Sequence, residues 1–117
     1  MTSQTHFLTP QYGDANRQIG EGWTVLEGAP QLATWIEHRS NDGSIVAGTW
    51  HASPGTLRAE YRFYEFVVMI EGLIEITPDG GETMTVRGGD SFAIEADFKG
   101  VWKIIEPVRK RFLLKLA

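Results

Sequence analysis

Apolar and polar residues alternate along most of this chain with a period of two, and no segment keeps the longer period of a helix. Gly, Pro, Asn and Asp interrupt the alternation at intervals typical of short strands joined by turns. We therefore expect an all-β fold in which about nine strands form a sandwich or a closed barrel. The expected strands cover residues 32–39, 44–51, 57–63, 65–70, 73–77, 82–87, 91–95, 100–106 and 109–116, and residues 23–26 could form a further short strand.

Residues 1–22 lack this alternation. They are polar and are interrupted by Pro10, Gly13 and Gly20, so we expect an arm that is loosely ordered or laid across another surface. Residues 23–117 are then a single domain, because a chain of 117 residues is long enough for one core with little to spare.

Asp42-Gly43 stands between two apolar runs, which is the strongest short-range signal for a hairpin. If these two residues are the whole loop, Trp35 lies opposite Trp50 and His38 lies opposite Ala47. The two tryptophans would then form an apolar wall across neighbouring strands.

In the stretch from Gly55 to Gly72, a single carboxylate, Glu65, stands at the head of the apolar run Phe66 to Ile70. We expect residues 65–70 and 73–77 to pair as a hairpin across Glu71-Gly72. Both faces of that hairpin are apolar, so both should be covered. Glu65, Val67, Met69, Ile74 and Ile76 share one face, and Phe66, Val68, Ile70 and Leu73 share the other. Two layers of the fold would explain this pattern, but we favour a homodimer whose interface is the outer face, with the arm crossing it.

The composition of the chain excludes several classes of partner and of chemistry. The net charge of −4 argues against a nucleic-acid partner, and we expect Arg109-Lys110-Arg111 to decorate a strand edge. Without cysteine the chain has no disulfide, thiolate nucleophile or zinc–thiolate site. It shows neither an apolar signal core nor a run of about 20 apolar residues, so we expect a cytoplasmic protein without a membrane partner.

Gly55, Glu65 and Gly72 match the Gly, Glu and Gly of the first cupin signature, G-x5-H-x-H-x3,4-E-x6-G, and Gly89 matches the first Gly of the second signature. The chain therefore resembles the cupin superfamily, and the resemblance implies a double-stranded β-helix, or jelly-roll barrel. The sequence also looks like that of the small single-domain cupins related to ureidoglycine aminohydrolase and the ethanolamine-utilisation cupin. The segments that carry this similarity are 48–50, 53–55, 88–90, 100–102 and 106–110.

The chain departs from the family at the metal ligands. The two histidine positions of the first signature fall on Ala59 and Tyr61, or on Arg58 and Glu60 with the longer spacer, and Gly100 replaces the histidine of the second. The histidines present are His6, His38 and His51, and the last two would lie roughly 13 Å apart along one face. A carboxylate site built from Glu60, Glu65 and Glu95 is conceivable. We predict no bound metal, and the alternative is Mn or Zn.

If the barrel follows the cupin pattern, an aromatic pocket surrounds Glu65, and Gly100 frees volume near its centre. Such a pocket suits a small organic molecule with a cationic or hydrogen-bond-donating group. Glu65 could act as a general base with Tyr61 as donor, or it could have a structural role only. The alternatives to a metal-free binder are a metal-dependent aminohydrolase and a purely structural partner surface. The expected ligand-binding residues are Trp35, Trp50, Ala59, Tyr61, Glu65, Val67, Gly100 and Trp102.

Overall fold

The computed structural model describes residues 3–116, and this part of the chain contains strands and turns but no helix. All strand pairs are antiparallel. The all-β prediction is therefore confirmed. The strands are β1 (Trp23–Glu27), β2 (Leu32–Arg39), β3 (Ile45–Ala52), β4 (Gly55–Glu60), β5 (Tyr64–Pro78), β6 (Met84–Arg87), β7 (Ser91–Ile94) and β8 (Lys99–Lys115).

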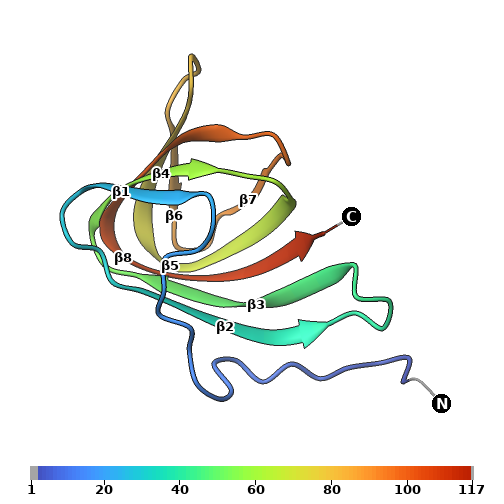
Figure 1. The fold of residues 1–117 in the computed structure, drawn as a ribbon. Coiled ribbons are helices and arrows are strands. Elements are labelled where there is room, and N and C mark those ends of the chain that lie inside the picture. The colour runs from blue at the N-terminus through green and yellow to red at the C-terminus, as the bar shows by residue number, and fades with distance from the viewer. Residues whose placement is uncertain (1–2, 117) are drawn as a thin grey trace.

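Two long strands, β5 and β8, run antiparallel through the whole molecule and curl strongly (Figure 1). The C-terminal half of β8 pairs with β3, and its N-terminal half pairs with β4. The N-terminal half of β5 pairs with β7, and its C-terminal half pairs with β6. Each long strand therefore belongs to both layers, which have the orders β2-β3-β8-β5-β7 and β1-β4-β8-β5-β6.

Both long strands bend where the sequence indicated turns. The register between them shifts three times around Glu71 and Gly72. Gly72 has a φ of 110°, and a Cβ atom there would lie 2.5 Å from the carbonyl oxygen of Pro107. Only glycine allows this left-handed conformation and this close approach of two backbones. The predicted hairpin across Glu71-Gly72 is therefore wrong, as is the predicted break at Pro107: each is the corner of one continuous strand.

The core lies between the two layers and confirms the predicted faces of β5. Val67 and Ile74 are completely buried, and Glu65, Met69 and Ile76 are nearly so. The register shifts at the corner change the parity, so that odd residues before it and even residues after it point inward. On the opposite face, Phe66 and Ile70 are 43% and 48% exposed.

The hairpin of β2 and β3 departs from the predicted register. Trp35 lies opposite Thr49 and Trp50 lies opposite Thr34, although His38 does lie opposite Ala47. The difference comes from a bulge between Ile36 and His38, where Glu37 is the additional residue. A one-residue slip moves a side chain to the other face of the sheet, so Trp35 and Trp50 point in opposite directions.

The loop of this hairpin is also longer than the predicted two residues, because the pair of Arg39 and Val46 is the last one in the ladder before the turn. Asp42 organises it by accepting hydrogen bonds from the hydroxyl groups of Ser40 and Ser44, at 2.8 and 2.7 Å, and from the Ser44 amide, at 3.0 Å. These donors lower the pKa of Asp42 to about 2.

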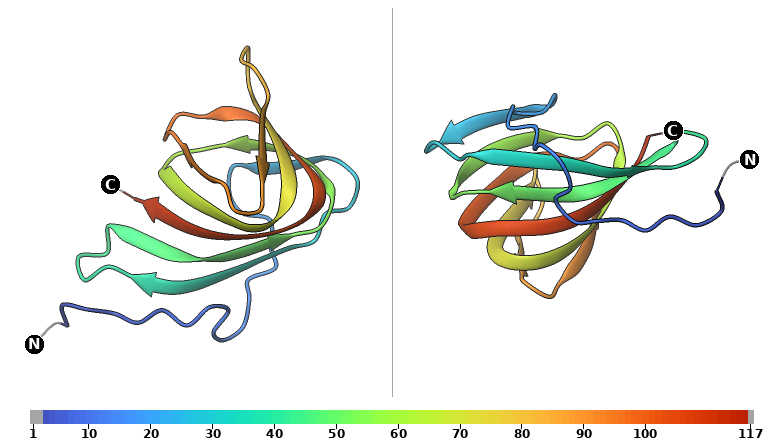
Figure 2. Two further views of the ribbon diagram at one scale, coloured as in Figure 1. Left: turned by 180° about the vertical axis from the view of Figure 1, so that it is seen from behind. Right: turned by 90° about the horizontal axis from the view of Figure 1, so that it is seen from below.

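The N-terminal segment, described from residue 3, runs beside the edge strand β2 and then crosses to β1 (Figures 1 and 2). Asn16 forms an isolated antiparallel bridge with Thr34, and Trp35 donates its indole N–H to the carbonyl oxygen of Gly13 at 3.2 Å. These contacts cover part of the outer face of β2, where Trp35 is only 9% exposed.

Candidate functional site

An open cavity of about 680 Å³ lies inside the curled sheets. Its walls come from the inward faces of β2, β3, β5 and β8, and its mouth is formed by the loop after β4 and by residues of the N-terminal segment. Its size is in the range of sites that hold small organic ligands. The residues that line it are Asn16, Gln18, Gly20, Glu21, Gly22, Trp23, Leu32, Thr34, Ile36, Trp50, Glu60, Tyr61, Arg62, Phe63, Glu65, Lys99, Lys110, Phe112 and Leu114.

Glu65 is 4% exposed, and its two carboxylate oxygens have different partners. The hydroxyl of Tyr61 donates to Oε1 at 2.5 Å, and Nζ of Lys110 donates to Oε2 at 2.9 Å. Lys110 itself is 3% exposed. A carboxylate and an ammonium can remain charged at this depth only if each compensates the other. Glu65, Tyr61 and Lys110 therefore form one connected group, which we call the inner triad.

Aromatic rings surround the ammonium of Lys110. Its Nζ lies 4.6 Å from the ring centroid of Trp50, 4.7 Å from that of Trp102 and 5.9 Å from that of Phe112. Attraction between the cation and these ring faces adds to the ion pair with Glu65. These rings form an aromatic cage. The aromatic pocket that we expected to suit a ligand with a cationic or hydrogen-bond-donating group thus already holds a cation of the protein itself.

The phenol of Tyr61 stays protonated. Burial, followed by the charge of Glu65 and the hydrogen bond to it, raises the pKa of Tyr61 well above its usual value of 10.0. Tyr61 is therefore a hydrogen-bond donor that fixes the orientation of the carboxylate. The ring of Tyr61 lines the cavity and lies 5.9 Å from the ring of Trp23.

The structure places the expected ligand-binding residues in three different environments. Trp50, Tyr61 and Glu65 line the cavity. Ala59, Val67 and Trp102 are fully buried in the core behind it, so that residues 57 and 59 are the inward positions of β4. The indole nitrogen of Trp102 is the buried side-chain polar atom without a hydrogen-bond partner within residues 3–116.

Trp35 and Gly100 are not at the cavity. Trp35 lines a smaller depression on the outer face of β2, because the bulge at Glu37 reverses its direction. Gly100 leaves no free volume, since a Cβ atom there would lie 2.3 Å from the carbonyl oxygen of Thr77 and 2.7 Å from Cζ of Phe98. Glycine is required at this position by the neighbouring backbone.

Lys110 was not among the site residues expected from the sequence. We expected it to decorate a strand edge, but it is among the most deeply buried residues of β8. The signal was the alternation of Val108, Lys110, Phe112 and Leu114, which places Lys110 on an otherwise apolar face. An isolated lysine on a buried face requires an anionic partner, and Glu65 is that partner.

The residues at the family's metal positions do not fit a metal ion. Ala59 and Gly100 offer no ligand atom, and both oxygens of Glu65 are occupied by the inner triad. Within residues 3–116, no group of three His, Cys, Asp or Glu side chains is close enough to hold an ion. Of the histidines, His6 and His38 lie together, with 4.7 Å between ring centroids, and His51 contacts Trp35 on the outer face.

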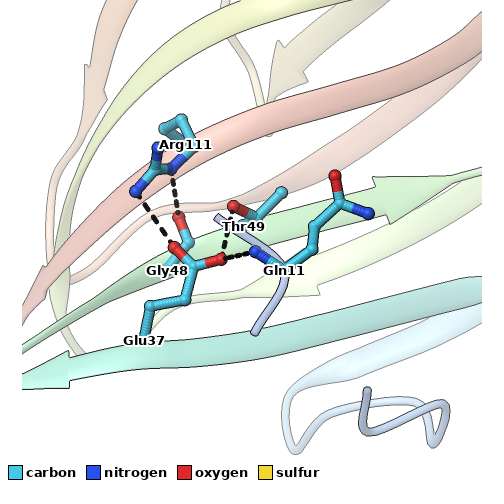
Figure 3. Close-up of polar contacts among 5 residues, drawn as sticks. All are labelled: Gln11, Glu37, Gly48, Thr49 and Arg111. Carbon is cyan, nitrogen blue, oxygen red and sulfur yellow. Dashed lines mark hydrogen bonds and ion pairs between the residues drawn. The ribbon is translucent and has the colours of Figure 1, made fainter. Parts of the chain in front are cut away.

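A second buried carboxylate, Glu37, lies on the outer face of the layer that contains β2, β3 and β8 (Figure 3). The bulge turns its side chain toward the sheet, where it is 1% exposed. Nη2 of Arg111 and the hydroxyl of Thr49 donate to it at 3.0 and 2.9 Å, and so does the backbone N–H of Gln11. Glu37 thus connects the N-terminal segment to β3 and β8.

The antiparallel layers that share β5 and β8, with a cavity inside, define a cupin-type double-stranded β-helix. A family model described as the EutQ-like cupin domain matches residues 39–112, and this chain belongs to that family. The predicted superfamily and fold are therefore confirmed. In residues 3–116 the structure has no helix long and apolar enough to cross a membrane.

Solved structures of similar fold agree with this assignment. The EutQ protein of Clostridium difficile has a TM-score of 0.66 and 16% identity, covering 76% of this chain and 71% of that chain. A putative ethanolamine utilization protein Q from Salmonella typhimurium LT2 has a TM-score of 0.64 and 19% identity, covering 96% and 99%. A DUF861 family protein from Thermotoga maritima has a TM-score of 0.54 and 26% identity, covering 55% and 73%. A search of curated proteins gives no match.

Proposed function

We propose that this protein binds a small organic molecule in its cavity and that Lys110 takes the place of a metal ion as the cationic partner of Glu65. The observation that carries the proposal is the inner triad, which satisfies Glu65 completely beside a cavity of about 680 Å³. Because the aromatic cage already holds an ammonium, the ligand has no need of positive charge. A metal-dependent aminohydrolase similar to ureidoglycine aminohydrolase finds no support in the residues at the metal positions.

The claim that Lys110 replaces a metal ion is tested by elemental analysis of the purified, dialysed protein. We expect well under one equivalent of Mn, Fe, Ni or Zn, and no rise in melting temperature when Mn or Zn is added. Metal near one equivalent that survives dialysis would contradict the proposal and favour the aminohydrolase.

The claim that a small organic molecule binds in the cavity is tested by thermal-shift screening with small metabolites, in which two variants are compared. A ligand at 100 times its Kd stabilises the folded protein by about 2.7 kcal/mol. Ile36→Trp adds bulk at a half-exposed position that lines the cavity, and Leu26→Trp adds the same bulk at a half-exposed position on β1 that does not. We expect the shift to disappear in Ile36→Trp only. A shift that persists in Ile36→Trp would place the ligand elsewhere.

We also propose that two copies associate through the outer face of the layer that contains β7. The register places Phe66 of β5 opposite Ala93 of β7 and opposite Leu113 of β8, and Leu113 lies opposite Ala47 of β3. This row of apolar side chains crosses four strands and remains partly open to solvent, with Phe66 43% exposed. An uncovered apolar row of this kind is typical of a protein–protein interface.

Sedimentation velocity tests the homodimer. Phe66→Glu places a charge in the centre of the row and should give a monomer, whereas Ile105→Glu, at a similarly exposed apolar position on the other layer, should leave the dimer intact. If the wild-type protein is a monomer at micromolar concentration, this part of the proposal fails, but the cavity proposal is unaffected.

A further inference from the structure

Lys110 combines burial with access to the cavity. The residue is only 3% exposed, yet it is part of the cavity wall, so its side chain borders the space that a ligand would fill. The neighbouring proton acceptor, Oε2 of Glu65, is 2.9 Å away. A lysine amine in a largely apolar pocket is the side chain that condenses with carbonyl compounds.

We propose that Lys110 forms a Schiff base with an aldehyde or ketone held in the cavity, and that Glu65 carries the proton that this reaction moves. This inference rests on the proposed function, because it assigns the ligand of the same cavity to the carbonyl class. It gives Lys110 a chemical role beyond that of a fixed cation.

The step balances with no further reactant. Lys110 passes one of its three Nζ protons to Oε2 of Glu65, and the neutral amine forms a bond to the carbonyl carbon. A second Nζ proton moves to the carbonyl oxygen, which gives a carbinolamine. Glu65 then returns its proton to that hydroxyl group, the C–O bond breaks, and water leaves. The product is a protonated imine on Nζ beside an ionised Glu65.

The surroundings suit the product as well as the ammonium. The protonated imine keeps one positive charge, so the ion pair with Glu65 and the ring faces of Trp50 and Trp102 continue to stabilise it. Tyr61 is a positioning residue, since its hydroxyl holds the other carboxylate oxygen at 2.5 Å. The aromatic and aliphatic cavity walls favour a carbonyl compound with a flat or apolar body.

The experiment treats the wild-type protein with benzaldehyde and cyanoborohydride near neutral pH, and maps the benzylated lysines by mass spectrometry. Lys103 and Lys115 are exposed, do not line the cavity, and act as internal controls. We expect Lys110 to be labelled at least tenfold faster than either, with a rate that saturates as benzaldehyde increases. Benzyl alcohol, which has the same ring but no carbonyl group, should compete without labelling.

Two variants separate the chemical role from a structural one. Glu65→Gln keeps the shape but cannot donate the proton that expels water from the carbinolamine, so labelling of Lys110 should slow at least tenfold, while the rates at Lys103 and Lys115 stay unchanged. Lys110→Arg keeps the charge and should abolish the saturable labelling. The inference would be overturned if Lys110 stayed unmodified, or if the label were confined to exposed lysines, including Lys99 at the mouth. If non-carbonyl metabolites still raise the melting temperature in that case, the proposed binding function survives.

Discussion

Two buried carboxylates are neutralised by adjacent residues of β8, and they are used differently. Lys110 points inward to Glu65, whereas Arg111 points outward to Glu37. The inner pair lies beside a cavity, and its lysine is almost fully buried. The outer pair shares its carboxylate with Thr49 and with the N–H of Gln11, and the side chain of Arg111 is 31% exposed. One alternating strand thus supports an amine at a cavity on one face and an anchor for the N-terminal segment on the other.

The largest expected effect comes from removing the two cations in turn. Lys110→Met leaves Glu65 buried without its cation and should lower the free energy of unfolding by about 3–5 kcal/mol. Arg111→Met should cost much less, because Glu37 keeps two other donors and solvent already reaches Arg111. Urea denaturation measures both. Adding Glu65→Gln to Lys110→Met should restore part of the lost stability. Equal losses in Lys110→Met and Arg111→Met would contradict the claim that the inner and outer ion pairs differ.

Removing the outer carboxylate should detach the N-terminal segment. Glu37→Ala removes the acceptor of three hydrogen bonds, and we expect a loss of about 2–3 kcal/mol. Trypsin should then cleave after Arg17 much faster than in the wild type, because the segment has lost its anchor. Glu27→Ala, which removes an exposed carboxylate on β1, is the control and should leave the cleavage rate unchanged. Unchanged cleavage in Glu37→Ala would show that Asn16 and Trp35 hold the segment without Glu37.

The strand pattern was predictable from the sequence because alternation reports which residues share a face, and on β5 it did so for Glu65, Val67 and Met69. Single-residue irregularities were not predictable in this way. Nothing in the period of two reveals that Glu37 is an additional residue, yet it decides that Trp35 leaves the cavity. Gly72 and Pro107 are turn formers by composition, and only their contact across two strands makes them corners. The alternation along β8 could have placed Lys110 on the buried face. Its neighbours Arg109 and Arg111, however, made the three residues resemble a solvated strand edge.

A smaller effect tests the third member of the inner triad. Tyr61→Phe removes one hydrogen bond to a charged acceptor and should lower the free energy of unfolding by about 1.5 kcal/mol. The matched control is Tyr64→Phe, because the hydroxyl of Tyr64 makes no side-chain hydrogen bond within residues 3–116. Denaturant titration at neutral pH compares the two. If Tyr61→Phe costs no more than Tyr64→Phe, Lys110 alone is sufficient to satisfy Glu65, and the inner triad reduces to a pair.

The smallest expected effect concerns Arg109, which shares the outer face with Arg111 and donates from Nε to Nε2 of His51 at 3.0 Å. Burial, followed by the charge of Arg109, lowers the pKa of His51 below its usual 6.5. Because the unfolded chain binds this proton more readily than the folded protein, His51 contributes stability above about pH 6.5 that is lost as the pH falls through the folded pKa. The slope of stability against pH in this window should therefore flatten in His51→Gln. In Arg109→Met, the pKa of His51 followed by NMR should move back toward 6.5, and no movement would show that burial alone holds this imidazole neutral.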